Sequence, residues 1–148
     1  MPRKGLILDA NILLRAVFGE RVRRILEEYE EEASFFTPEI CFRDAKRYAE
    51  DLCTHKGLEI DLAISVLEQI RQIVESVDVS LYEEYEQAAR ARMDKRDPED
   101  WPIVAVAFLL DLPIWTEDQD FFGCGIPVWT TDRVELYLDP SRLRTEPQ

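Results

Sequence analysis

Short runs of apolar residues alternate along this chain with longer segments in which apolar residues recur every three or four positions. The short runs predict strands at residues 5–9, 34–36, 77–79, 113–116 and 127–130. The longer segments predict helices at 12–29, from 37 onward, at 58–74, at 81–93 and around 103–110. Thr37 is expected to cap the second of these helices and Pro38 to open it. Apolar strands that alternate with helices are typical of a parallel sheet covered on both faces, so the pattern predicts an α/β fold.

The composition fits one globular domain. Of 148 residues, 46% are hydrophobic and 33% are charged, which is enough for one core. We expect a single domain over residues 1–148, with its core at about residues 5–130 and a C-terminal extension at 131–148. We expect no secretory leader, and no apolar stretch approaches the roughly 20 residues that span a membrane. Three cysteines without a C-x-x-C pair favour reduced thiols, so the sequence predicts a cytoplasmic protein with no membrane partner.

Carboxylates stand where two predicted strands end and where one predicted helix begins. Asp9 ends the first strand, Asp118 follows the strand at 113–116, and Asp100 lies at the start of the helix around 103–110. In parallel sheets the carboxyl ends of the strands share one edge, so we expect these acids to meet. Two carboxylates about 4 Å apart repel by roughly 4 kcal/mol at an effective dielectric of about 20. Capping would explain Asp97 or Asp100 but not the other acids, so the sequence predicts a cation site.

The types of side chain restrict the chemistry of that site. Oxygen ligands favour a hard cation, Mg²⁺ or Mn²⁺, over zinc. The chain has a single histidine, His55, so a zinc site or a two-histidine ribonuclease mechanism lacks its parts. No serine lies in a G-x-S-x-G turn, which argues against a serine hydrolase.

Three segments in order resemble the PIN-domain family of metal-dependent ribonucleases. They are Leu8–Leu14, Asp97–Ala105 and Leu112–Phe121, and their order spans residues 5 to about 130. The resemblance implies a three-layer α/β/α sandwich, a Mg²⁺ or Mn²⁺ site, and hydrolysis of RNA phosphodiester bonds by metal-activated water. Many bacterial members are toxins of toxin–antitoxin pairs and form homodimers. The expected partners are therefore RNA, an antitoxin protein and a second copy of the chain.

The resemblance also implies roles for individual acids. The family's first, third and fourth acids fall on Asp9, Asp100 and Asp118, the expected metal ligands, with Asp120 close behind. The family's second acid is usually Glu; Asp44 stands in the matching helix and is the predicted second catalytic acid. That prediction also rests on helical geometry, which sets Asp44 at the edge of an apolar stripe formed by Cys41, Ala45, Tyr48 and Leu52 and puts Glu39 and Glu50 on the polar side.

Supporting roles fall on polar neighbours of these acids. Asn11 and Thr116 match polar positions that support the site in the family, and Asp97 or Asp120 is expected to orient the attacking water. Ala10 departs from the family, which usually has a hydroxyl residue after the first acid. That departure removes a hydrogen bond but no metal ligand.

The net charge of −13 opposes binding of a polyanion by the surface as a whole. RNA contact is therefore expected at a local basic patch, Arg43, Lys46 and Arg47, with the cluster from Arg90 to Arg96 as the alternative. Both patches also fit plain solvated helix surface.

Two other classes of protein remain as alternatives. A catalytically idle PIN-like module that binds a protein or RNA partner is favoured by the acidic surface and by Ala10. A phosphatase of the haloacid dehalogenase type would require an aspartate where this chain has Asn11, and is the weaker alternative.

Overall fold

Within residues 3–141, which the computed structural model describes, five parallel strands form one sheet in the order β3-β2-β1-β4-β5. The strands are β1 (Lys4–Leu8), β2 (Ala33–Pro38), β3 (Val74–Val77), β4 (Ile114–Trp115) and β5 (Val128–Trp129). All four neighbouring pairs are parallel. The predicted parallel sheet is confirmed, although β4 and β5 are shorter than the apolar runs that predicted them.

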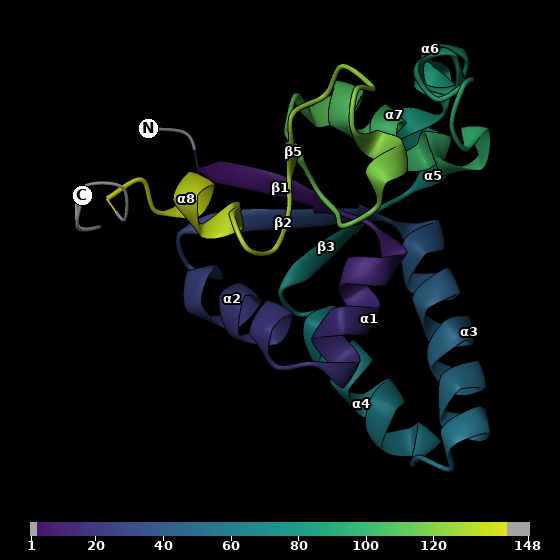
Figure 1. Ribbon diagram of the computed structural model, residues 1–148, viewed down its shortest axis with the longest axis vertical. Helices are drawn as coiled ribbons and strands as arrows, with labels where there is room; N and C mark the ends of the chain where they lie inside the picture. The colour runs from purple at the N-terminus through teal and green to yellow at the C-terminus, as the bar shows by residue number, and fades with distance from the viewer. Residues whose placement is uncertain (1–2, 142–148) are drawn as a thin grey trace.

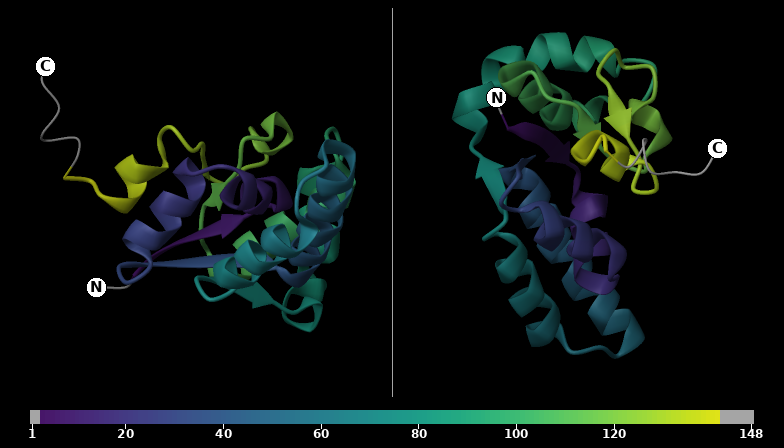
Figure 2. Two further views of the ribbon diagram at one scale, coloured as in Figure 1. Left: turned by 90° about the horizontal axis from the view of Figure 1, so that it is seen from below. Right: turned by 90° about the vertical axis from the view of Figure 1, so that its left-hand side faces the viewer.

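Helices cover both faces of this sheet (Figure 1). On one side lie α1 (Ala10–Phe18), α2 (Arg21–Tyr29), α3 (Glu39–Lys56) and α4 (Ile60–Ile70). On the other side lie α5 (Val79–Tyr82), α6 (Glu86–Arg92) and α7 (Trp101–Leu110), with the short 3₁₀ turns η1 (Glu83–Tyr85) and η2 (Pro98–Asp100). The turned views show the same two groups (Figure 2). The predicted three-layer α/β/α arrangement is confirmed.

The centre of the core lies between β1 and α7. Leu6, Ile7 and Leu8 of β1 have no exposed surface. In α7, six consecutive residues from Pro102 to Ala107 are buried, so this helix is covered on every side. A helix that is apolar all round is stable only when it is buried in this way. Because α7 packs on β1 and β2, its N-terminus has a fixed position relative to the sheet.

The predicted helix at 58–74 is wrong at both ends. The helix α4 covers only Ile60–Ile70, and Val74–Val77 forms the edge strand β3 beside Phe35–Pro38. In β3 the two valines are buried and the two residues between them are exposed. Isoleucine and valine near the end of α4 fit both the spacing of a helix and that of a strand. Pairing with β2 makes this segment a strand.

The predicted strand at 77–79 and the continuous helix at 81–93 are also wrong. The Asp78 carboxylate accepts a hydrogen bond from the Ser80 backbone amide at 3.0 Å and caps α5, which begins at Val79. A 3₁₀ turn, η1, then separates α5 from α6. Its tighter winding interrupts the period that a single helix would need.

The predicted cap at Thr37 is wrong as well. Thr37 lies inside β2, fully buried, and its hydroxyl donates to the Leu8 carbonyl at 2.7 Å. Pro38 ends β2 and precedes α3. The hydroxyl therefore joins two neighbouring strands at the edge where both end.

The predicted C-terminal extension contains a helix that sequence patterns did not indicate, α8 (Val134–Leu138). Tyr137 of α8 donates to the Gly5 carbonyl at 3.0 Å and accepts at its own carbonyl from Lys4 Nζ at 2.7 Å. Tyr137 thus fastens α8 to β1, and the remainder of that extension, 142–148, lies outside the described residues. None of the helices at 3–141 is both long and apolar enough to cross a membrane.

The Thr37 hydroxyl gives a test of this strand junction. Thr37→Val keeps the shape of the side chain but removes the donor to the buried Leu8 carbonyl, which should lower the free energy of unfolding by about 1–3 kcal/mol. Urea denaturation measures it. Thr54→Val is the matched control, because the Thr54 hydroxyl donates to the Glu50 carbonyl on an exposed helix surface. Equal losses in the two variants would contradict the role given to the junction.

Candidate metal centre

The site lies where strand order reverses in the sheet. From β1 the chain continues to β2 on one side, while β4 lies on the other side of β1. The register sets Leu8 beside Trp115, so Asp9 and Thr116 are the first residues beyond the two strand ends. Open parallel sheets bind ligands at such a point, outside the carboxyl ends of the strands.

The Thr116 hydroxyl connects the two strand ends. It donates to Asp9 Oδ2 and accepts from the Asp118 backbone amide at 3.0 Å. The second oxygen of Asp9 accepts from the Ile12 amide at 2.9 Å and caps α1. Thr116 and Asp9 are both buried, Asp9 with 8% of its surface exposed. One hydroxyl therefore fixes Asp9 and the start of the Asp118 turn relative to each other.

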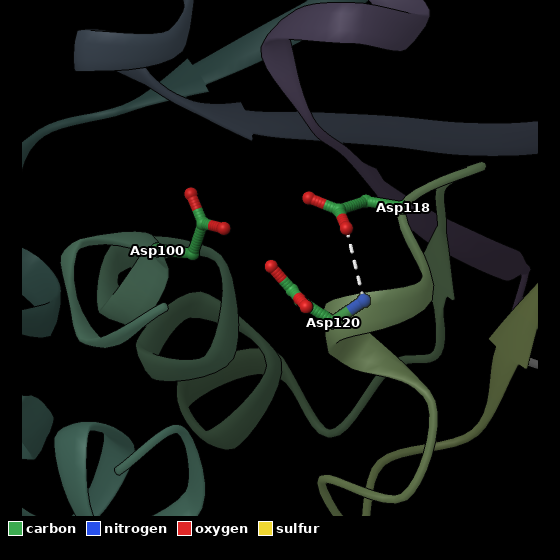
Figure 3. Close-up of side chains that lie close together, drawn as sticks. All are labelled: Asp100, Asp118 and Asp120. Carbon is green, nitrogen blue, oxygen red and sulfur yellow. Dashed lines mark hydrogen bonds between the residues drawn. The ribbon is translucent and has the colours of Figure 1, made fainter. Parts of the chain in front are cut away.

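Three carboxylates converge beside this connection. Asp100, Asp118 and Asp120 each offer an oxygen, and these oxygens lie within 4.8 Å of one another. Asp100 comes from the start of α7 and the other two come from the turn at η3 (Gln119–Phe121), and the side chains point toward one another (Figure 3). Asp118 Oδ1 also accepts from the Asp120 amide at 2.9 Å, which closes the turn. We call Asp100, Asp118 and Asp120 the acid cluster.

Capping accounts for Asp97 but not for Asp100. Asp97 accepts from the Glu99 amide at 3.1 Å and begins η2. Asp100 precedes α7, yet its side chain makes no capping hydrogen bond. Its carboxylate is instead directed at the acid cluster, where no basic side chain forms an ion pair with it among the described residues.

Burial and repulsion make Asp100 hard to ionise. Burial, followed by the charges of Asp97, Asp118, Asp9 and Asp120, raises the pKa of Asp100 to about 7. Burial also raises the pKa of Asp9, against the opposing effect of its hydrogen bonds from Thr116 and Ile12. A cation reverses this balance, because it favours the charged form of every carboxylate near it.

The donor set fits a hard divalent cation. Every converging group is a carboxylate, and the described residues place no histidine in the cluster. Such oxygen ligands suit Mg²⁺ or Mn²⁺. Asp9 is outside the group of mutually close oxygens, and both its oxygens already accept hydrogen bonds. Its charge still reaches the cluster, since it raises the pKa of Asp100.

Asp44 does not join the acid cluster. Its carboxylate pairs with Arg47 at 3.4 Å, and 36% of its side chain is exposed. The predicted stripe on α3 is wrong at Tyr48, which is 48% exposed. The buried face of α3 consists of Cys41, Phe42, Ala45, Ala49 and Cys53.

Asp44 nevertheless stands at the margin of the site. The Cys41 thiol has its pKa raised mainly by burial and further by the charges of Asp9, Asp44 and Asp100, so all three carboxylates act electrostatically on one thiol. Glu39, which helical geometry placed on the polar side of α3, forms a two-contact ion pair with Arg71 at 3.3 and 3.4 Å, and this pair ties α3 to the end of α4. The predicted catalytic role of Asp44 stays a prediction.

A cavity of about 610 Å³ opens beside the Asp9 end of the site. Asn11, which is exposed, lines it together with Arg15, Arg21 and Glu117. Sequence patterns did not single out Glu117 as a site residue, although it stands next to Asp118. Its carboxylate accepts from the Thr131 amide at 2.7 Å and adds negative charge near Asp9.

The two basic patches differ in how they are engaged. Arg43, Lys46 and Arg47 are exposed on α3, and Arg47 pairs with Asp44. In the second patch, Arg90 pairs with Glu86 at 2.8 Å and with Glu99 at 3.5 Å. Arg92 and Arg96 donate to backbone carbonyls of the loop after η3. The first patch therefore offers more free basic groups than the second.

Comparison with known families gives a match over most of the chain. Residues 7–139 match the PIN domain. The chain belongs to the PIN-domain family. The family resemblance drawn from the three acidic motifs is thus confirmed. A comparison with curated protein sequences finds no significant match.

Solved structures share the fold of this PIN domain. A chain of VapBC2 from Rickettsia felis, bound to a DNA fragment from its promoter, aligns with a TM-score of 0.68 at 14% identity and covers 85% of this chain and 98% of that one. A chain of DNA-bound VapBC from Salmonella typhimurium aligns with a TM-score of 0.67 at 19% identity, covering 88% and 99%. A toxin–antitoxin complex from Klebsiella pneumoniae gives 0.59 at 22% identity, covering 85% and 97%.

The raised pKa of Asp100 predicts how stability changes with pH in the metal-free PIN domain. Between pH 3.8 and about 7 the folded state holds the Asp100 proton and the unfolded chain releases it. Rising pH therefore lowers the free energy of unfolding across this window. Urea denaturation at about pH 5 and about pH 8 should show the decline, and Asp100→Asn should reduce it.

Asp61→Asn, on the exposed surface of α4, is the control for this comparison, because it also removes one negative charge. It should leave the decline near that of the wild type. If Asp100→Asn and Asp61→Asn change the decline equally, the acid cluster is not its source.

Proposed function

We propose that this PIN domain is a metal-dependent endoribonuclease that hydrolyses RNA phosphodiester bonds with Mg²⁺ or Mn²⁺. The observation that carries the proposal is the acid cluster at the strand-order reversal, three carboxylates within 4.8 Å without a basic partner for Asp100. Membership of the PIN-domain family supports it, because members are typically nucleases.

Each acid has a proposed part. Asp100 and Asp118 hold the cation, and Asp120 offers a third carboxylate oxygen close to theirs. Asp9, at the end of β1, contributes its negative charge or a further ligand. The bound cation would supply an activated water and neutralise charge that develops on the phosphate. Thr116 fixes the orientation of Asp9, and Asp120 or Asp97 orients the attacking water.

Asp44 and Asn11 complete the proposed site at its margins. The charge of Asp44 acts on the same thiol as those of Asp9 and Asp100, so release from Arg47 would leave its carboxylate available to the site. Asn11 follows Asp9 by two residues and lines the adjoining cavity, where it would contact a bound RNA strand.

RNA is proposed to approach over α3. Arg43, Lys46 and Arg47 are exposed basic groups in the first half of this helix, close in sequence to Asp44. A local patch of this kind attracts phosphates although the whole chain carries a net charge of −13. The cation at the acid cluster would reduce the repulsion further.

The proposed partners include an antitoxin protein and a second copy of the chain. The similar solved structures are VapBC or toxin–antitoxin complexes, which supports a role as a toxin of such a pair. Large apolar side chains remain exposed and offer contact surface for a protein partner: Phe18, Ile40, Leu58, Leu62, Val79 and Leu81. Three buried unpaired cysteines fit a reducing compartment, and we propose the cytoplasm.

A catalytically idle, partner-binding PIN-like module is the second candidate, favoured by Ala10 and the acidic surface. The two candidates differ in what they require of the acid cluster. A nuclease requires it to bind a cation, whereas an idle module does not.

Replacing one cluster acid separates the candidates. Asp100→Asn removes a charge but no capping hydrogen bond, so the fold should be retained. Its Mn²⁺-dependent cleavage of labelled single-stranded RNA should fall by roughly 100-fold or more, because charge stabilisation worth several kcal/mol is lost. Asp9→Asn should act in the same direction.

Glu28→Gln is the control, since Glu28 is exposed on α2 on the other side of the sheet from α7. It should cleave RNA as the wild type does, and EDTA should abolish cleavage by both. Cleavage by Asp100→Asn at the wild-type rate would exclude the proposed site. Absence of cleavage and of Mn²⁺ binding in the wild type would favour the idle module.

A further inference from the structure

The acid cluster is assembled from two segments that are separate in sequence. One segment runs from α6 through η2 to the start of α7 and carries Asp97 and Asp100. The other runs from β4 through η3 to β5 and carries Asp118 and Asp120. Each is held by its own short-range bonds, such as Arg96 amide to Met93 carbonyl in the first and Phe121 amide to Asp118 carbonyl in the second.

Two arginines of the first segment bind the backbone of the second. Arg92 donates to the Cys124 carbonyl at 3.1 Å, and Arg96 donates from Nε to the Phe122 carbonyl at 3.3 Å. Arg92 also lies over the Phe108 ring of α7, with 5.4 Å from the guanidinium carbon to the ring centre. Its guanidinium therefore contacts both the helix that begins after Asp100 and the loop that follows Asp120.

The loop is shaped to receive these guanidinium groups. Gly123 and Gly125 have φ angles of +88° and +92°, which disfavour any residue with a side chain. A Cβ at Gly123 would lie 2.7 Å from Arg96 Nη2, and a Cβ at Gly125 would collide with Arg92 Nη1. Both arginines thus occupy space that side chains would otherwise fill.

These bonds oppose the repulsion inside the cluster. Without a cation, Asp100 faces the charges of Asp118 and Asp120, which favours separation of the two segments. Hydrogen bonds from a charged donor are among the stronger ones, and here there are two. They join the first segment to the loop that follows Asp120.

We propose that Arg92 and Arg96 are positioning residues for the cation site, which set the separation of Asp100 from Asp118 and Asp120 before a cation binds. The inference rests on the proposed metal site and adds to it.

Binding of Mn²⁺ alone to the metal-free protein tests this inference. Free Mn²⁺ has an electron paramagnetic resonance signal that is lost on binding, so titration gives a Kd without any assay of activity. Arg92→Gln/Arg96→Gln should weaken Mn²⁺ binding by about tenfold or more, the effect expected for groups that orient metal ligands. Arg96→Lys keeps a positively charged donor and should recover part of the affinity lost in Arg96→Gln.

Arg23→Gln is the matched control, because Arg23 also donates to a backbone carbonyl, that of Ala16 at 3.2 Å, but joins α2 to α1. It should lose thermal stability to a similar extent and keep the wild-type Kd. If the double variant fails to fold, as circular dichroism would show, Arg96→Gln alone replaces it, with a weaker effect expected in the same direction.

The outcomes separate this inference from the proposed function. Wild-type Mn²⁺ binding together with wild-type affinity in the folded arginine variants would overturn the positioning role and leave the metal site intact. Failure of the wild type itself to bind Mn²⁺ would overturn both. Weakened binding in the arginine variants but not in Arg23→Gln supports the inference.

Discussion

Repulsion among carboxylates at one end of the sheet is the constraint on which the site depends. The strand order sets Asp9 beside Thr116, and the turn after β4 then directs Asp118 and Asp120 toward Asp100. Nothing about an apolar core requires acids there, and burial makes their charge costly. The fold holds them with neutral donors: the Thr116 hydroxyl and the backbone amides of Ile12 and Asp120. A cation bound at the acid cluster, as we propose, would offset this cost.

The same constraint shapes the surroundings of the cluster. The helix α7 is buried on every side, so Asp100 at its start has a fixed position. The opposing turn is anchored in the core by Phe121 and Cys124, and its glycines leave room for Arg92 and Arg96 to bind its backbone. For an acidic protein of net charge −13, the proposed cation at this place would also give an RNA phosphate a positive point of attachment.

Sequence patterns predicted those features of the site that depend on where the strands end. Apolar runs located β1 and β4, and the rule that parallel strands share an edge predicted that Asp9, Asp100 and Asp118 lie near one another. The approach of Asp120 depends on the turn at η3, which no period of apolar residues specifies. Asp44 was placed from a helix stripe that included Tyr48, but Phe42 and Ala49 face the core instead. The larger apolar side chain, Tyr48, is exposed, whereas the small Ala49 is buried, so apolar character alone did not predict which residues of α3 face the core.

Other features leave little trace in a sequence. Arg92 and Arg96 bind backbone carbonyls, so no particular side chain marks their partners. The Thr37 hydroxyl joins two strands that are distant in the chain, whereas a threonine before a proline is typical of a helix start. At 58–74, isoleucine and valine fit both a helix and a strand, and only the presence of β2 as a pairing partner selects β3.

The central claim is that the acid cluster is a cation site. Anomalous X-ray diffraction from crystals of the protein grown with Mn²⁺ tests it most directly, because the anomalous signal locates manganese independently of any catalytic assay. The account predicts a strong peak bounded by the carboxylates of Asp100, Asp118 and Asp120, and loss of that peak in crystals of Asp100→Asn. Manganese absent from this position in the wild type, or bound only at exposed acids elsewhere, would contradict the account.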